Sequence, residues 1–143
     1  MIRTLNRTMP ILLLVAAIMS CGKENTPSRD HIPLIKAQLA RLQDSVKNKS
    51  AASIDSVLSI NILKNKQSSD SLLNFVYGAG GQFGFETFGQ PVIIYTDKVA
   101  KIEAYISDST NQTDRPVIFS FIFDDGQWLL HKFEPDTSKR DSL

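Results

Sequence analysis

The chain has 143 residues, with 16 lysines and arginines against 15 aspartates and glutamates, and a single cysteine. This near-neutral balance argues against a nucleic-acid-binding protein, which needs an excess of basic residues gathered on one face. One cysteine cannot form an internal disulfide, and no cluster of histidines, cysteines or acids has the spacing of a metal site, so we expect neither a metal nor a cofactor.

The first 21 residues resemble a bacterial lipoprotein signal. Arg3 and Arg7 precede an apolar run from Ile11 to Met19, and Ile18-Met19-Ser20-Cys21 matches the lipobox, with Met19 at a position where a smaller residue is commoner. The run is too short for a spanning helix, which needs about 20 apolar residues. The resemblance implies that residues 1–20 are a signal peptide and that Cys21 carries the lipid that attaches the protein to a membrane.

Removal of residues 1–20 takes away Arg3 and Arg7 and no acid, which leaves 14 basic residues against 15 acidic ones. Electrostatic adhesion to lipid is therefore not expected. Gly22, rather than an aspartate, follows the cysteine. In a Gram-negative cell this residue resembles the signal for sorting to the outer membrane. We therefore expect a lipid-anchored protein of the cell envelope, and the sequence does not decide between the periplasmic face and the cell surface.

Residues 21–30 are polar and predict a tether, which is followed by three helical patterns. The first has apolar residues three and four positions apart and Asp30 as its N-cap; these residues are Ile32, Ile35, Leu39, Leu42 and Val46. The second has Ser53 as its N-cap and buries Ile54, Val57, Leu58 and Leu63. The third runs from Ser69 or Asp70 to Tyr77, stops at Gly78 and buries Leu72, Leu73 and Val76.

The second half of the chain has the two-residue period of strands. Strands are predicted at Val92 to Thr96, at Ala100 to Ile106, at Val117 to Phe123 and at Gln127 to Phe133. Residues 107–116 read as a solvated loop, and Asp124-Asp125-Gly126 predicts a tight hairpin turn. Residues 135–143 are expected to form a flexible tail.

Helices followed by antiparallel strands predict an α+β domain over residues 31–134, with two to three helices packed on a curved sheet of about four strands. The segments Tyr95 to Ile102 and Phe121 to Leu130, together with Asp55 to Ser59, resemble nuclear transport factor two-like domains. The resemblance implies a cone-shaped fold with a pocket, and a homodimer formed through sheet faces. A cystatin-like arrangement is the alternative, although its single long helix fits this pattern less well.

The spacing of the glycines in the glycine-rich segment from Gly78 to Gly84 argues against a nucleotide-binding loop. Phe83 stands where a dinucleotide fingerprint needs glycine, and no Gly-Lys-Ser/Thr follows. We expect a flexible connection whose aromatic residues Phe83, Phe85 and Phe88 either join the core or form a mobile apolar surface for a partner.

His131 is the candidate base, because His31 lies beside the tether. On the last strand His131 is predicted to share a face with Leu129 and Phe133, opposite Trp128 and Leu130, within reach of Tyr95, Asp97 or Tyr105. Trp128 is either a pocket wall or a core residue.

We expect a non-catalytic binding module for a protein or a small apolar ligand, with no catalytic residues. One alternative is a small lyase or isomerase that uses His131, as in the ketosteroid isomerases and scytalone dehydratases of the resembled fold. The other is an inhibitor or immunity-type protein that uses exposed loop aromatics.

Overall fold

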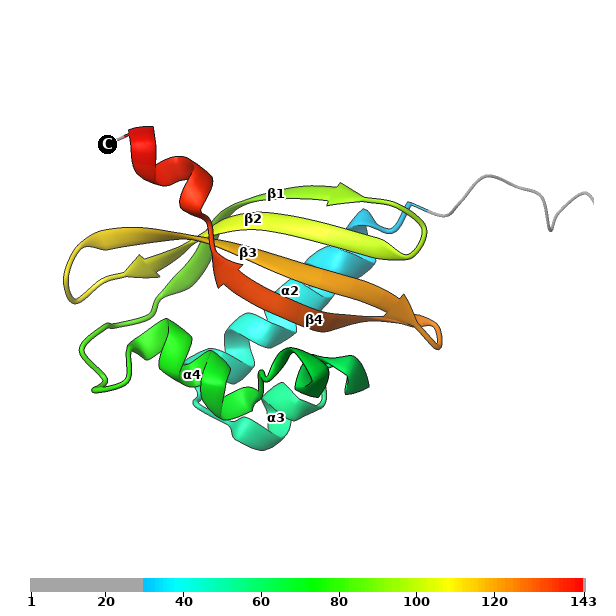
Figure 1. Cartoon of the computed structure of the whole chain (residues 1–143), viewed down its shortest axis with the longest axis horizontal. Coiled ribbons are helices and arrows are strands. Elements are labelled where there is room, and N and C mark those ends of the chain that lie inside the picture. The colour runs from blue at the N-terminus through cyan, green and yellow to red at the C-terminus, as the bar shows by residue number, and fades with distance from the viewer. Residues whose placement is uncertain (1–29, 143) are drawn as a thin grey trace, which may run out of the picture. The chain divides into compact units, whose positions relative to one another are not determined.

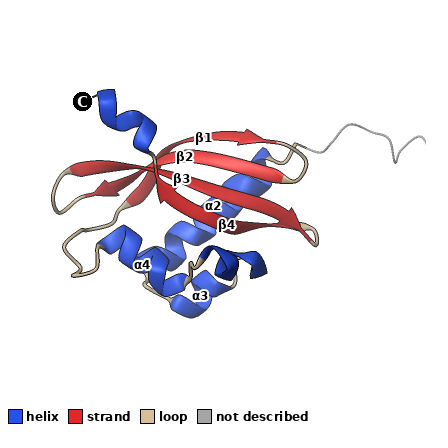
Figure 2. Cartoon of the chain, in the orientation of Figure 1, coloured by secondary structure: helices blue, strands red, loops and turns tan. Residues whose placement is uncertain are grey.

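Three helices precede a four-stranded antiparallel sheet in the computed structural model, which describes residues 30–142 (Figure 1). The helical elements are α2 (Ile32–Lys47), α3 (Ala51–Asp55), the 3-10 segment η2 (Ile60–Asn65) and α4 (Ser69–Tyr77). The strands are β1 (Thr87–Tyr95), β2 (Val99–Asp108), β3 (Thr113–Asp124) and β4 (Gln127–Pro135), in the order β1-β2-β3-β4. Figure 2 shows α2, α3 and α4 on one side of the sheet. The predicted α+β fold is confirmed.

Helices are present in all three predicted regions, but the second is shorter than predicted: α3 ends at Asp55, so Val57 and Leu58 lie outside it, and Leu58 forms a bridge with Leu130. Two of the predicted caps are also wrong. The residue that caps α2 is His31, and its side chain makes no capping bond. Pro33 in the first turn has no N–H to offer, which removes a bond that a capping side chain would accept. The caps of α3 and α4 are Ser50 and Ser68, whose hydroxyls accept the N–H groups three residues later at 3.3 and 3.2 Å.

The inner face of the sheet is packed against the helices. The predicted alternation is confirmed in β2, where Ala100, Ile102, Ala104 and Ile106 are all buried, and in β3, where Val117, Phe119 and Phe121 are buried. Ile35, Leu42 and Val46 of α2 and Leu72 and Val76 of α4 complete this core. Each such side chain contributes about 2 kcal/mol by leaving water, so the inner face is the main source of stability.

A bulge in β4 changes the predicted face of Phe133. Asp125 and Gly126 both have positive φ, +47° and +80°, as the predicted two-residue hairpin requires. Farther along, Ser120 pairs with Lys132 but Phe121 pairs with Leu130, so His131 is the extra residue. Because one inserted residue reverses the alternation, Phe133 is buried on the same side as Trp128 and Leu130. The prediction that it lies opposite them is wrong.

The polar segment 107–116 is mostly strand and not a solvated loop. Asp108 pairs with Thr113 and Ser107 pairs with Asp114, so β2 and β3 leave only residues 109–112 between them. β1 likewise begins at Thr87, upstream of the predicted start at Val92, and continues through a bulge between Gly89 and Val92. Cross-strand hydrogen bonds satisfy the backbone here although the side chains are polar. At the other end of the chain, β4 is followed by η3 (Thr137–Ser142) where the sequence predicts a tail.

The outer edge of β4 is covered by the segment that links α3 to α4. Ser59 N–H donates to the carbonyl of Leu130, and Leu130 N–H donates to the carbonyl of Val57, both at 2.8 Å. The Gln67 side chain donates to the Phe133 carbonyl at 2.8 Å and accepts its N–H at 3.2 Å. This covering protects an edge that would otherwise pair with another chain.

The buried carboxylate of Asp108 fastens the glycine-rich segment to the sheet. It accepts the N–H of Gly84 at 3.0 Å and those of Thr110 and Asn111 at 2.9 and 3.1 Å. A Cβ at Gly84 would lie 2.8 Å from an oxygen of Asp108 and 2.4 Å from the hydroxyl of Thr110. Glycine is therefore required by close approach, and the predicted flexible connection is held in place.

Gly84→Ala is expected to lower the free energy of unfolding by about 2 kcal/mol, because the added methyl group separates Asp108 from the segment it holds. Urea denaturation followed by circular dichroism measures the change. Gly89→Ala is the matched control, since its Cβ meets nothing closer than 3.6 Å. Equal effects of the two substitutions would contradict this role for Gly84.

Candidate functional site

His131 is not placed as a catalytic base requires. It is half-buried on the β4 bulge, with Nδ1 3.5 Å from the Ser59 hydroxyl, and its carbonyl accepts a hydrogen bond from Asn65. Within residues 30–142, no carboxylate oxygen lies within 4.0 Å of its ring nitrogens. A general base needs an orienting partner and a cavity, and His131 lines none of the pockets described below.

The other candidates on the strands do not meet at one site. Tyr95 and Trp128 lie on the inner face, where Trp128 is buried beneath α2. Tyr105 lies on the outer face, with the Lys139 ammonium 4.8 Å from its ring centre. Tyr95 and Tyr105 therefore lie on opposite faces of the sheet.

His31, which the sequence analysis set aside, is the histidine inside the aromatic cluster. The Trp128 indole N–H donates to His31 Nδ1 at 3.3 Å. The ring centre of His31 lies 5.2 Å from that of Phe123, 5.4 Å from that of Trp128 and 6.1 Å from that of Tyr95. A sequence signal existed: His31 is four residues before Ile35, so it continues the apolar stripe of α2. These contacts attach the start of α2 to β1, β3 and β4.

The aromatic residues of the glycine-rich segment form no exposed patch. Phe88 is buried, with its ring centre 4.8 Å from that of Phe119, and Phe85 stacks on Phe88 at 4.7 Å. Phe83 is half-buried beneath Arg115, whose guanidinium carbon lies 4.1 Å from its ring centre. The first two residues belong to the core, and the third packs against a cation.

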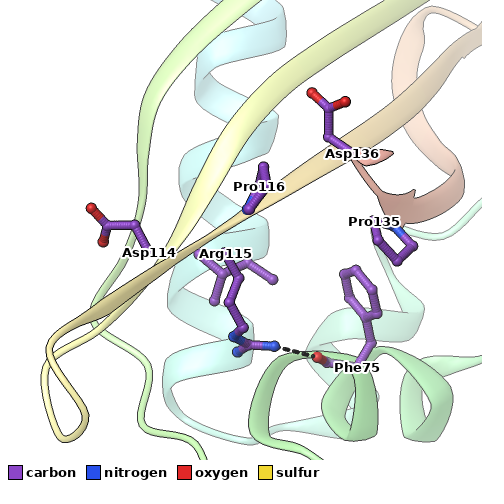
Figure 3. A pocket seen from close by; sticks show the side chains of 7 residues that line it. Phe75, Asp114, Arg115, Pro116, Pro135 and Asp136 are labelled. Atoms are coloured by element: carbon purple, nitrogen blue, oxygen red, sulfur yellow. Dashed lines mark hydrogen bonds between the residues drawn. The ribbon is translucent and has the colours of Figure 1, made fainter. Parts of the chain in front are cut away.

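A pocket of about 280 Å³ lies where β3 extends past the end of β4 (Figure 3). The pairing of these strands starts only at Val117 and Pro135, so residues 113–116 have β2 as their one strand neighbour. The residues that line the pocket are Phe75, Ile106, Asp114, Arg115, Pro116, Pro135 and Asp136. We name it the Arg115 pocket. Four of these seven side chains are apolar, and the other three are charged.

Arg115 reaches the C-terminal end of α4 from the inner face of the sheet. Its guanidinium donates to the carbonyl of Phe75 at 3.1 Å and to the carbonyl of Val76. Among the residues that the structure describes, no carboxylate oxygen lies within 4.0 Å of it, and Nε has no hydrogen-bond partner. Burial lowers the pKa of Arg115, and the charge of Asp108 opposes this shift. The side chain stays a cation at neutral pH.

The two carboxylates of the pocket point away from this guanidinium (Figure 3). Asp136 is 1 % exposed and accepts the N–H and hydroxyl of Ser138 at 3.1 and 2.5 Å. Its other oxygen lies 3.7 Å from the Lys139 ammonium. The hydrogen bond from the Ser138 side chain is the main reason that the pKa of Asp136 is lowered. Asp114 is exposed and makes no ion pair within the described part of the chain.

Sequence reasoning missed Arg115 because it lies in the segment interpreted as a loop. Arg115 has the same parity as Val117, Phe119 and Phe121, which would have placed a charged residue on the core-facing side of β3. Three other surface hollows, of about 250, 270 and 360 Å³, are of similar size. Volume therefore does not distinguish one of these hollows as a site. The Arg115 pocket is distinguished by its half-buried guanidinium, which forms no ion pair with the described residues.

In the described residues no group of histidines, cysteines and acids could hold a metal ion, and no helix is long and apolar enough to cross a membrane. No family model matches the chain, and no curated protein is similar to it. It is similar to a solved NTF2-like superfamily protein from Salmonella enterica subsp. enterica serovar Typhimurium str. LT2, with 10 % identity and a TM-score of 0.46. The match covers 71 % of this chain and 87 % of that one.

His31→Ala is expected to lower the free energy of unfolding by about 2 kcal/mol, because it opens a cavity beside Trp128. The fluorescence of Trp128, the only tryptophan, should shift to longer wavelength as water reaches the ring. His131→Ala, on the half-buried bulge, should cost less than about 1 kcal/mol and leave the emission unchanged. A larger loss for His131→Ala would contradict this placement of the two histidines.

Acid is expected to destabilise the domain through Asp108 and Asp136. The pKa of each is lowered from its usual 3.8, chiefly by the Asn111 side chain for Asp108 and by the Ser138 side chain for Asp136. A carboxylate with a lower pKa in the folded state stabilises the fold above the unfolded value of about 3.9, and this contribution is lost as the pH falls through the folded value. Urea unfolding at pH 7 and pH 3 measures the loss.

Asp108→Asn should reduce this loss of stability between pH 7 and pH 3, because one of the two responsible groups no longer titrates. Asp125→Asn, on the exposed hairpin turn, is the matched control and should retain the loss. If Asp108→Asn lost as much stability in acid as the unaltered chain, Asp108 would not be a source of the pH dependence.

Proposed function

We propose that this protein is a lipid-anchored, non-catalytic binding module of the bacterial cell envelope. The observation that carries the binding role is the Arg115 pocket, an open hollow with apolar walls and a half-buried cation that has no carboxylate partner. Groups of this kind recognise and orient a ligand.

The membrane attachment rests on the sequence. Cys21 and the signal-like residues before it lie outside the described residues. The lipobox resemblance supports a thioether-linked lipid at Cys21, and multiple acyl chains hold a protein at a bilayer where one chain does not. The cell envelope, and the outer membrane in a Gram-negative host, are the corresponding locations.

The two alternatives receive less support. A lyase or isomerase would need an acid or a tyrosine beside His131, and Ser59 lies there instead. An inhibitor that uses loop aromatics would need Phe83, Phe85 and Phe88 exposed, and they are packed. The outer face of the sheet does expose Val92, Ile94 and Val99. A homodimer across that face stays a prediction.

Cys21→Ala is expected to move the protein from the membrane fraction to the soluble fraction, because no other feature of the chain is predicted to bind lipid. Mass spectrometry of the native protein should find Cys21 at the N-terminus with acyl chains attached. An unmodified Cys21 in native membranes would contradict the proposed anchor.

The same two preparations test the binding role. Material that co-purifies with the lipidated protein, compared with the Cys21→Ala form, should contain one enriched small molecule or one enriched protein. Recovery of neither from native membranes would count against a binding module, whatever the state of Cys21.

A further inference from the structure

The guanidinium of Arg115 has more hydrogen-bonding capacity than the protein uses. An arginine side chain carries five N–H donors, and the structure assigns acceptors only at the carbonyls of Phe75 and Val76. The C-terminal end of a helix carries about half a negative charge, which offsets only part of the guanidinium charge. A half-buried cation whose charge is only partly neutralised favours the binding of an anion.

The acids nearest to Arg115 are committed to other groups. Asp108 holds the N–H groups of Gly84, Thr110 and Asn111, and its charge reaches Arg115 without forming an ion pair with it. Asp136 is buried, with one oxygen bound by Ser138 and the other 3.7 Å from the Lys139 ammonium. Asp114 is exposed at the pocket rim and points away from the guanidinium. None of them forms an ion pair with Arg115. The counter-ion site is therefore open to a group from outside the chain.

The remaining wall of the pocket selects an apolar body. Phe75, Ile106, Pro116 and Pro135 line it, and its volume of about 280 Å³ is just below the range of pockets for drug-sized ligands. Planar guanidinium groups match the two oxygens of a carboxylate in a paired geometry. A small acid with one apolar group fits this combination of size, charge and shape.

We propose that the Arg115 pocket binds the carboxylate of a small apolar organic acid, with Arg115 as its anion site and Phe75 and the two prolines against its apolar group. This proposal rests on the binding function proposed above and names its ligand class. Both a free organic acid and the carboxyl terminus of a peptide present this chemistry.

Binding to the full chain in detergent can be measured by isothermal titration calorimetry with matched probes. N-acetylphenylalanine should bind with a Kd at least about tenfold lower than N-acetylphenylalanine amide, because a charge-assisted bond to the guanidinium is lost in the amide. The tripeptide Ala-Ala-Phe with a free carboxyl terminus separates the two sources. Preference for the tripeptide assigns the site to peptide termini, and equal binding assigns it to free acids.

Variants test whether Arg115 is responsible. Arg115→Gln should weaken binding of the acid at least about tenfold, whereas Arg41→Gln, an exposed arginine on α2, should leave it unchanged. Since Arg115 also binds the end of α4, the folded state of its variant must be checked by circular dichroism. Asp114→Asn avoids that difficulty, because its exposed carboxylate repels an incoming anion, and it should tighten binding of the acid but not of the amide.

Equal binding of acid and amide, or no effect of Asp114→Asn and of folded Arg115→Gln, would overturn the carboxylate proposal. If no probe binds but a ligand without a carboxylate co-purifies from native membranes, this inference fails and the binding function stands. If the acid binds as expected and nothing co-purifies, the ligand class stands and the native role fails.

Discussion

Burial of the sheet's inner face beneath α2 and α4 is the constraint on which the rest of this domain depends. Trp128, Phe119 and Phe121 are at most 1 % exposed, so these three large side chains contribute almost their whole surface to the core. Because a single cysteine cannot form an internal disulfide, this core supplies most of the stability. The Arg115 pocket lies at the end of the sheet, where β3 extends past β4.

The bulge at His131 and the overhang of β3 both follow from how β4 fits this core. The bulge brings Phe133 back to the inner face, where it packs 5.1 Å from Phe75 between ring centres. The same strand ends at Pro135, opposite Val117, so the first four residues of β3 have no β4 partner. Arg115 is one of these four residues. The pocket therefore forms because β3 extends past the end of β4. The guanidinium of Arg115 is held there by the carbonyls of Phe75 and Val76 at the end of α4.

The two histidines are placed differently from what their positions in the sequence suggested. His131 is the extra residue of the β4 bulge, and its Nδ1 lies 3.5 Å from the Ser59 hydroxyl. His31 adjoins the tether, yet it becomes a member of the core through its hydrogen bond with Trp128. Position along the chain is a poor guide to burial at a bulge or at the start of a helix, because a shift of one residue reverses the face.

The sequence alone determined the helix-then-strand order, the alternation of β2 and β3 and the Asp-Gly hairpin turn, because each depends on local spacing. The proposal of a lipid at Cys21 also rests on the sequence alone. Tertiary structure decided the faces after the bulge, the polar hairpin closed by Asp108, and the pocket around Arg115. These depend on pairing register and on the packing of α4 against β3, which join residues about forty positions apart. Local periodicity does not specify such contacts, and the candidate site is built from them.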